Sequence, residues 1–221
     1  MPFRFETKNS PNIPDPESKN LSSFLLSNKQ FLSVALFMLD IKKEPTDISL
    51  RINNSPKSST IKGDVSFGEF INLMDEFYNT TQPLLDSRRG WLLELLVGEC
   101  YPTSRSPQCC MIPECLVYYL GSQLSKKDVD VVFKDAFIEL LECKAAVINY
   151  LHPPLPDETK DKLRLMERVK DLANAHSLSC NIYLATFNRD LNFPKSILRN
   201  NGFDSFKIMN RKDIVNRLQA V

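Results

Sequence analysis

The stretch KDVDVVFKDAFIELLECKAA, residues 127–146, contains two apolar runs that carry acidic residues and a lysine. The runs VDVVF (129–133) and AFIELLECKAAV (136–147) are rich in the β-branched and aromatic side chains typical of strands. The polar pair Lys134 and Asp135 between them favours a tight hairpin. Unpaired charges are costly in a buried strand, so the acidic positions of this hairpin call for a partner or a function.

Strand geometry sorts these charged side chains onto defined faces. Because side chains alternate along a strand, Leu140, Glu142 and Lys144 share one face of the second run. Asp128 and Asp130 share a face of the first run in the same way. If the two strands pair as a hairpin, Asp130 and Glu142 approach each other near the strand end, where two carboxylates repel unless a cation or a proton lies between them.

Paired carboxylates of this kind indicate a metal site for a hard cation. Oxygen ligands suit Mg²⁺ or Mn²⁺, which keeps several waters and needs only one or two protein carboxylates. The neighbouring ammonium of Lys144 is suited to orient or deprotonate a metal-activated water and to stabilise negative charge on a phosphorus centre. The residues therefore predict metal-assisted hydrolysis of a phosphodiester.

Composition places the chain among ordinary globular proteins. It has 221 residues, of which 43% are hydrophobic and 25% charged, enough to bury a sizeable core. Only six residues are glycine, and the sequence contains neither a GxGxxG nor a GxxxxGK[ST] phosphate loop. The formal net charge of +1 excludes a strongly basic protein, so any nucleic-acid contact must come from a local patch.

The sequence predicts an intracellular protein, cytoplasmic or nuclear, that does not cross a membrane. The N-terminal residues lack the apolar core of a signal peptide, and the apolar run 31–41 is too short to span a bilayer. The six cysteines are accordingly expected to be reduced thiols. Cys109, Cys110 and Cys115 cluster, but no CxxC pair is present, so a zinc site is not predicted.

Three segments are expected along the chain. Residues 1–20 carry four prolines and predict a flexible arm, and residues 21–86 predict a mainly helical extension. Residues 87–221 follow the order α-β-β-β-α-β-α-β-α. That order predicts an α/β domain with a mixed β-sheet flanked by helices on both faces.

From residue 87 onward the chain resembles the PD-(D/E)xK nuclease superfamily, which has the restriction-endonuclease-like fold. DVDVVF followed by AFIELLECKAA resembles the D…ExK signature, and GWLLELL resembles the glutamate-bearing helix that precedes the hairpin in that superfamily. KDKLRLMERVKDLANAHSLSCNIYLATF is similar to the helix and strand that follow it. The resemblance covers roughly residues 87–221 and none of residues 1–80.

The resemblance implies a Mg²⁺- or Mn²⁺-dependent endonuclease that cleaves DNA or RNA. Asp130 and Glu142 would hold the metal, with the backbone carbonyl of Cys143 as a further ligand. Lys144 would position the attacking water, and Glu94 would assist a second metal or the waters of the first. All four side chains, Glu94, Asp130, Glu142 and Lys144, are thereby catalytic candidates.

Several alternatives remain open at this point. Val129 stands where the family has a proline, and Asp128 is an alternative to Asp130. Glu99 competes with Glu94, which is preferred because it follows Gly90 at the usual offset of the family. An excess of basic residues from Lys195 to residue 221 is either a patch for a nucleic-acid backbone or an ordinary charged surface.

Two other functions compete with that of a nuclease. The first is a catalytically inactive module of the nuclease fold that binds nucleic acid or a protein partner. The second is an interaction protein in which the apolar segments 21–41 and 66–85 form a homo-oligomer or partner interface.

Overall fold

The computed structural model describes residues 2–220, which form a mixed α/β fold around a seven-stranded sheet. The strand order is β1-β2-β4-β5-β6-β7, with β3 paired to β2. Strands β5, β6 and β7 run parallel to one another, and the remaining pairs are antiparallel. The strands are β1 (Phe3–Thr7), β2 (Cys110–Tyr119), β3 (Ser122–Gln123), β4 (Val129–Lys134), β5 (Phe137–Cys143), β6 (Ser179–Ala185) and β7 (Lys207–Met209).

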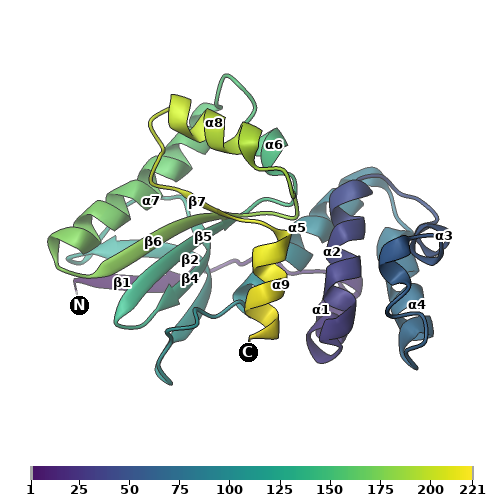
Figure 1. Cartoon of the computed structure of the whole chain (residues 1–221). Coiled ribbons are helices and arrows are strands. Elements are labelled where there is room, and N and C mark those ends of the chain that lie inside the picture. Colours follow the sequence, from purple (N-terminus) through teal and green to yellow (C-terminus); the bar gives the residue numbers. More distant parts are fainter. Residues whose placement is uncertain (1, 221) are drawn as a thin grey trace.

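Helices cover both faces of the sheet (Figure 1). The N-terminal group is α1 (Pro16–Ser27), α2 (Leu32–Ile41), α3 (Ile48–Asn53), α4 (Phe67–Tyr78) and α5 (Gln82–Gly98). The later helices are α6 (Val147–Tyr150), α7 (Asp157–Ala175), α8 (Asn192–Asn200) and α9 (Arg211–Gln219). This arrangement confirms the predicted mixed sheet flanked by helices. The order of elements after residue 87 is the predicted one with two short additions, β3 and α6.

Strand alternation divides the interior into two cores. Leu140 and Leu184 point to the core that contains the apolar stripe of α7 and the buried residues of α8. Leu141 and Ala185, one position further along each strand, point to the core shared by α1, α2, α4, α5 and α9. The N-terminal helices and one face of the sheet therefore bury a single continuous set of apolar side chains.

The β4–β5 hairpin forms as the sequence predicts, but its turn lies at Asp135 and Ala136, because Lys134 is the last residue of β4. Val131 pairs with Leu141, and Val132 pairs with Leu140. The backbone N–H of Asp135 donates to the carbonyl of Phe137 at 2.9 Å and closes the turn. The hairpin brings the charged ends of both strands to the same edge of the sheet.

The prediction of a flexible arm over residues 1–20 is wrong for residues 16–20, which begin α1, and for residues 3–7. These residues form β1, which pairs with β2 and buries Phe3 and Phe5. The alternation of apolar and polar side chains in FRFET is a strand signal that the surrounding prolines masked. Residue 1, also within the predicted arm, lies outside the described residues.

The predicted boundary at residues 86 and 87 falls inside α5. Pro83 lies in the first turn of this helix, where its fixed φ favours initiation, and Thr81 before it is extended. The helix therefore begins at Gln82, although the sequence reading placed the break near Ser87.

The apolar side chains of segments 21–41 and 66–85 are largely packed inside the chain. Leu25, Leu36 and Phe70 are fully buried in the core that α5 shares with the sheet. The hydrophobicity of these segments is thus explained by folding. An oligomer or partner interface formed by them stays a prediction.

In the described part of the chain, no single helix is long and apolar enough to cross a membrane. Pro16–Ser27 together with Lys29–Ile41 meets the criterion of length and composition only as a pair, and the two pieces are bent by 106°.

Arg88 joins α1, α4 and α5 through a buried ion pair. Its guanidinium pairs with Asp15 and Glu17 and donates to the carbonyls of Glu76 and Phe77. Burial opposes the ionisation of Asp15, but the hydrogen bonds from Ser18 and Arg88 outweigh it and hold the pKa of Asp15 below its ordinary value.

We expect Asp15→Asn to destabilise the protein at neutral pH. Asparagine still caps α1, but it leaves Arg88 with one carboxylate fewer, at a cost of about 1–3 kcal/mol. Because folding lowers the pKa of Asp15, its contribution is complete above about pH 4 and is lost as the pH falls through the folded-state value. Urea denaturation at pH 7 and pH 3 measures this difference.

The matched control is Asp161→Asn, whose side chain is 62% exposed. It should change the free energy of unfolding by less than about 0.5 kcal/mol at either pH. A loss in Asp15→Asn that is equally large at both pH values would contradict the role given to the carboxylate charge.

Candidate active site

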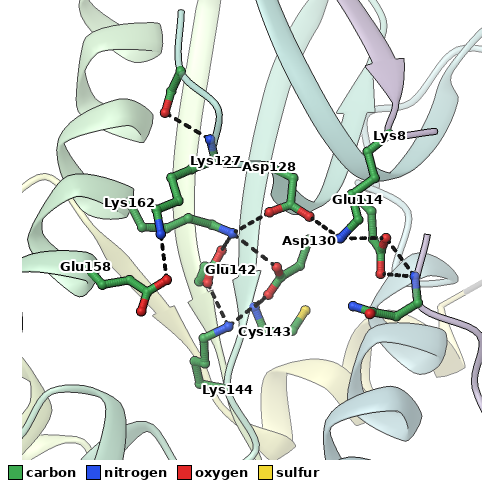
Figure 2. Close-up of polar contacts among 12 residues, drawn as sticks. Lys8, Glu114, Lys127, Asp128, Asp130, Glu142, Cys143, Lys144, Glu158 and Lys162 are labelled. Atoms are coloured by element: carbon green, nitrogen blue, oxygen red, sulfur yellow. Dashed lines mark hydrogen bonds and ion pairs between the residues drawn. The ribbon is translucent and has the colours of Figure 1, made fainter. Parts of the chain in front are cut away.

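Asp130, Glu142 and Lys144 meet at the end of the β4–β5 hairpin (Figure 2). The Nζ of Lys144 lies 2.7 Å from Oε1 of Glu142 and 3.2 Å from Oδ2 of Asp130. The backbone N–H of Cys143 also donates to Oδ2 of Asp130 at 2.7 Å. The hairpin register therefore brings these three predicted side chains together.

The sequence reading missed Lys162, which lies on α7 and completes the cluster. Its Nζ is 3.0 Å from Oε2 of Glu142, 3.4 Å from Oδ1 of Asp130 and 3.5 Å from Oδ1 of Asp128. Figure 2 shows the three carboxylates converging on this ammonium group. Lys162 precedes Met166 and Val169 on the buried stripe of α7, and a lysine on that stripe was the available sequence signal.

Because the cluster is buried, the pKa of each charged group in it depends on the charges of the others. Glu142 is only 2% exposed, and burial together with the charge of Asp130 raises its pKa, whereas Lys144 and Lys162 oppose the rise. For both lysines burial lowers the pKa, but the attraction of Glu142 and Asp130 outweighs it and raises the pKa above the ordinary value. Both lysines are therefore ammonium groups at neutral pH.

Two buried polar atoms beside Lys144 accept or donate no hydrogen bond within residues 2–220. Oε2 of Glu142 is close enough to Lys162 for an ion pair, but it is not in hydrogen-bonding geometry. The hydroxyl of Tyr150 likewise has no partner, while its ring lies 5.1 Å from the Nζ of Lys144. An unsatisfied buried hydroxyl costs about 1–3 kcal/mol, so Tyr150 favours a polar ligand in this pocket, whereas Oε2 of Glu142 is compensated by the ammonium of Lys162 at 3.0 Å.

Glu94 approaches the cluster from α5 and lines a cavity of about 1060 Å³ together with Cys143, Lys144 and Tyr150. Burial, followed by the charge of Asp130, raises the pKa of Glu94 to about 8. The carboxyl group is therefore mostly protonated at pH 7. Glu99, the alternative considered from the sequence, is exposed at the end of α5 and does not line this cavity.

Asp128 and Asp130 occupy different positions in the cluster. Both contact Lys162, but only Asp130 contacts Lys144. Asp128 pairs instead with Lys8, at 3.1 Å from its Nζ. The geometry thus favours Asp130 as the partner of Glu142 and Lys144.

The segment after β1 also reaches this edge of the sheet. Lys8 lies 3.2 Å from Glu114, whose carboxylate accepts two hydrogen bonds from the backbone N–H of Asn12. Glu114 has a φ of 41°, a costly conformation for a residue other than glycine, and it stands between Pro113 and Cys115, which pair with Val131 and Val129 of β4. Sequence reasoning missed both Lys8 and Glu114; the glutamate after Pro113 inside a strand was the available signal.

The carboxylates are held by lysines, and no group of three or more His, Cys, Asp or Glu side chains in residues 2–220 is arranged as a metal site. All six cysteines are free thiols. The thiol of Cys143 is buried, which raises its pKa well above the ordinary value. A ligand role of its backbone carbonyl remains a prediction.

Comparisons with known proteins place this site in no family. The sequence matches no protein-family model and no curated protein. The crystal structure of protein VC1899 from Vibrio cholerae is similar over 99% of this chain, with a TM-score of 0.41 and 14% sequence identity. This chain spans 57% of the length of that protein. A likeness at this level assigns neither fold family nor function.

We expect Lys162→Met to destabilise the protein by about 3–5 kcal/mol, because it leaves buried carboxylates without their shared ammonium group. Urea denaturation at pH 7 measures the loss. Lys160→Met on the same helix is the control, since the ion pair of Lys160 within residues 2–220 is with the exposed Asp157 and its loss should cost less than about 1 kcal/mol. Equal losses in the two variants would show that the cluster does not depend on Lys162.

Proposed function

We propose that this protein is a Mg²⁺- or Mn²⁺-dependent nuclease of the restriction-endonuclease-like fold that hydrolyses phosphodiester bonds of DNA or RNA. One observation carries the proposal: the ammonium of Lys144 contacts the carboxylates of both Asp130 and Glu142 at the open end of a hairpin. The mixed sheet and the order of elements after residue 87 fit the resemblance that suggests this activity.

The side chains present fit a hard divalent cation. Oε2 of Glu142 is a buried carboxylate oxygen that accepts no hydrogen bond in the described structure, and Asp130 is beside it. Asp130 and Glu142 would hold the cation, with the Cys143 carbonyl and Glu94 as further candidates. When bound, Mg²⁺ supplies Lewis acidity and a more acidic water.

Lys144 acts in this proposal through its charge. Because its pKa is raised by Glu142 and Asp130 despite burial, the ammonium persists at neutral pH and does not serve as the initial base. It orients the attacking water and stabilises the negative charge that develops on the phosphoryl oxygens. Hydrolysis forms a bond from the water oxygen to phosphorus and breaks the bond from phosphorus to one ester oxygen. A proton of the water passes to that leaving ester oxygen, which becomes a hydroxyl group. The adjoining cavity is also lined by the exposed Lys43, a cation suited to a phosphate-bearing substrate.

Cleavage of labelled DNA and RNA in the presence of Mg²⁺ or Mn²⁺ tests the activity. We expect Lys144→Ala to lower the cleavage rate by about 10²-fold or more, because it removes charge stabilisation from the transition state. Lys160→Ala is the control and should retain the activity of the wild type. Cleavage that survives in a folded Lys144→Ala protein would refute the assignment.

Thermal denaturation tests metal binding separately from cleavage. A cation that binds only the folded state stabilises it by about 2.7 kcal/mol at a concentration of 100 Kd. We expect Mg²⁺ or Mn²⁺ to raise the Tm of the wild type and to have a smaller effect on Glu142→Gln. The metal site would be refuted by equal shifts in both proteins, or by no shift in the wild type.

A second candidate function is a catalytically inactive module that binds nucleic acid or a protein partner. Lys162 favours it, because its ammonium lies within 3.0–3.5 Å of all three carboxylates and, together with Lys8 and Lys144, balances their charge without a metal. This function predicts no metal-dependent cleavage and no metal-dependent rise in Tm.

A further inference from the structure

A second cleft, of about 560 Å³, is lined by residues of α2 and α9. These two helices lie side by side in Figure 1. Four of the residues that line it are basic, and none is acidic: Lys57, Arg189, Arg211 and Lys212. They come from three segments that are distant in sequence. The chain as a whole has a net charge of only +1, so this cleft concentrates positive charge that the rest of the molecule balances.

The charges in this cleft are poorly compensated. Arg211 pairs with Asp40 at 2.8 Å, whereas Lys57, Arg189 and Lys212 form no ion pair within residues 2–220. Burial lowers the pKa of Arg211; Asp40 opposes this effect and the neighbouring Arg189 adds to it. Because like charges held together repel, such a cleft is stabilised by an anion.

Phe37 holds two of these cations beside each other. The Nζ of Lys57 lies 5.1 Å from the centroid of the Phe37 ring, and the guanidinium of Arg211 lies 5.0 Å from it. Cation–π contacts of this kind orient a cation with little loss of hydration at an exposed site. The side chains of Lys57 and Arg211 are therefore already held in position in the absence of a ligand.

The parallel strands place this cleft and the candidate active site at the same end of the sheet, where the C-terminal ends of β5, β6 and β7 lie. Cys143 pairs with Ala185, and Ala185 pairs with Met209, so β5, β6 and β7 end side by side. Lys144 follows the first of these strand ends, and Asn210 follows the third. Two inter-strand spacings amount to about 10 Å, a short distance along a nucleic-acid strand.

Buried hydrogen bonds fix the cleft to the turn that follows Lys144. Asp40 pairs with Arg211 and also accepts a hydrogen bond from Nδ2 of Asn188 at 3.0 Å. Oδ1 of Asn188 accepts from the backbone N–H of Val147 at 3.1 Å. The distance between the basic cleft and the carboxylate cluster is thus set by the fold.

We propose that the cleft between α2 and α9 binds the phosphate backbone of a nucleic-acid strand whose adjoining phosphodiester reaches Asp130, Glu142 and Lys144. This inference rests on the proposed nuclease function, to which it adds the path of the substrate. Contacts of this kind position the strand by its charge and do not read its sequence.

The experiment measures binding of fluorescein-labelled oligonucleotides, single- and double-stranded, by fluorescence anisotropy in EDTA. Without divalent metal the readout does not depend on cleavage. We expect Lys57→Glu combined with Lys212→Glu to weaken binding by about tenfold or more and to reduce the slope of log Kd against log salt by about 1.5.

The control combines Lys19→Glu with Arg168→Glu, which makes the same change in net charge on exposed basic residues outside the cleft. It should weaken binding less than threefold. If charge reversal alters the Tm, Lys57→Gln combined with Arg189→Gln provides the same comparison with neutral side chains.

The outcomes separate this inference from the nuclease proposal. Wild-type protein that binds through the cleft but does not cleave would refute the nuclease alone. Absence of binding by the wild type, or equal losses in the cleft variant and the control, would overturn the inference about the cleft. Binding of a glutamate-rich peptide as tight as that of the oligonucleotide would also overturn it, because the cleft would then suit an acidic protein partner.

Discussion

The rest of the site depends on the ion pairs that two lysines make with the carboxylates of Asp130 and Glu142. Each of these charges would be costly to bury alone, and together they are tolerated because Lys144 and Lys162 lie close to both acids. The cluster ties the hairpin to α7, which otherwise contributes apolar packing. It also leaves Oε2 of Glu142 without a hydrogen bond, which suits the site to binding a further ligand.

The sheet places other candidate binding residues beside this cluster. Because β5, β6 and β7 are parallel, the chain leaves all three at one edge, where ligands commonly bind in α/β proteins. The N-terminal helices complete that edge: Lys43, just after α2, lines the cavity beside Lys144, and Phe37 within α2 lines the basic cleft. The helical extension and the sheet therefore share one core and also form the walls of the candidate substrate path.

Much of the hairpin could be predicted because its information is local. Strand alternation and the polar residues near the turn were enough to predict that Asp130, Glu142 and Lys144 come together. The strand formed by residues 3–7 was missed because nearby prolines indicated a loose arm, while its partner β2 lies more than 100 residues away. The start of α5 was misplaced because Pro83 can either end a helix or begin one.

The sequence by itself determined the α/β class, the hairpin and the faces of its charged side chains, since period-two alternation and turn residues act over a few positions. Only the tertiary structure decided that Lys162 enters the carboxylate cluster, that Glu94 and not Glu99 faces it, and that Lys57, Arg189 and Arg211 share a cleft. These contacts join residues far apart in sequence. Their distances depend on the packing of whole helices against the sheet, and one sequence contains no local pattern that specifies them.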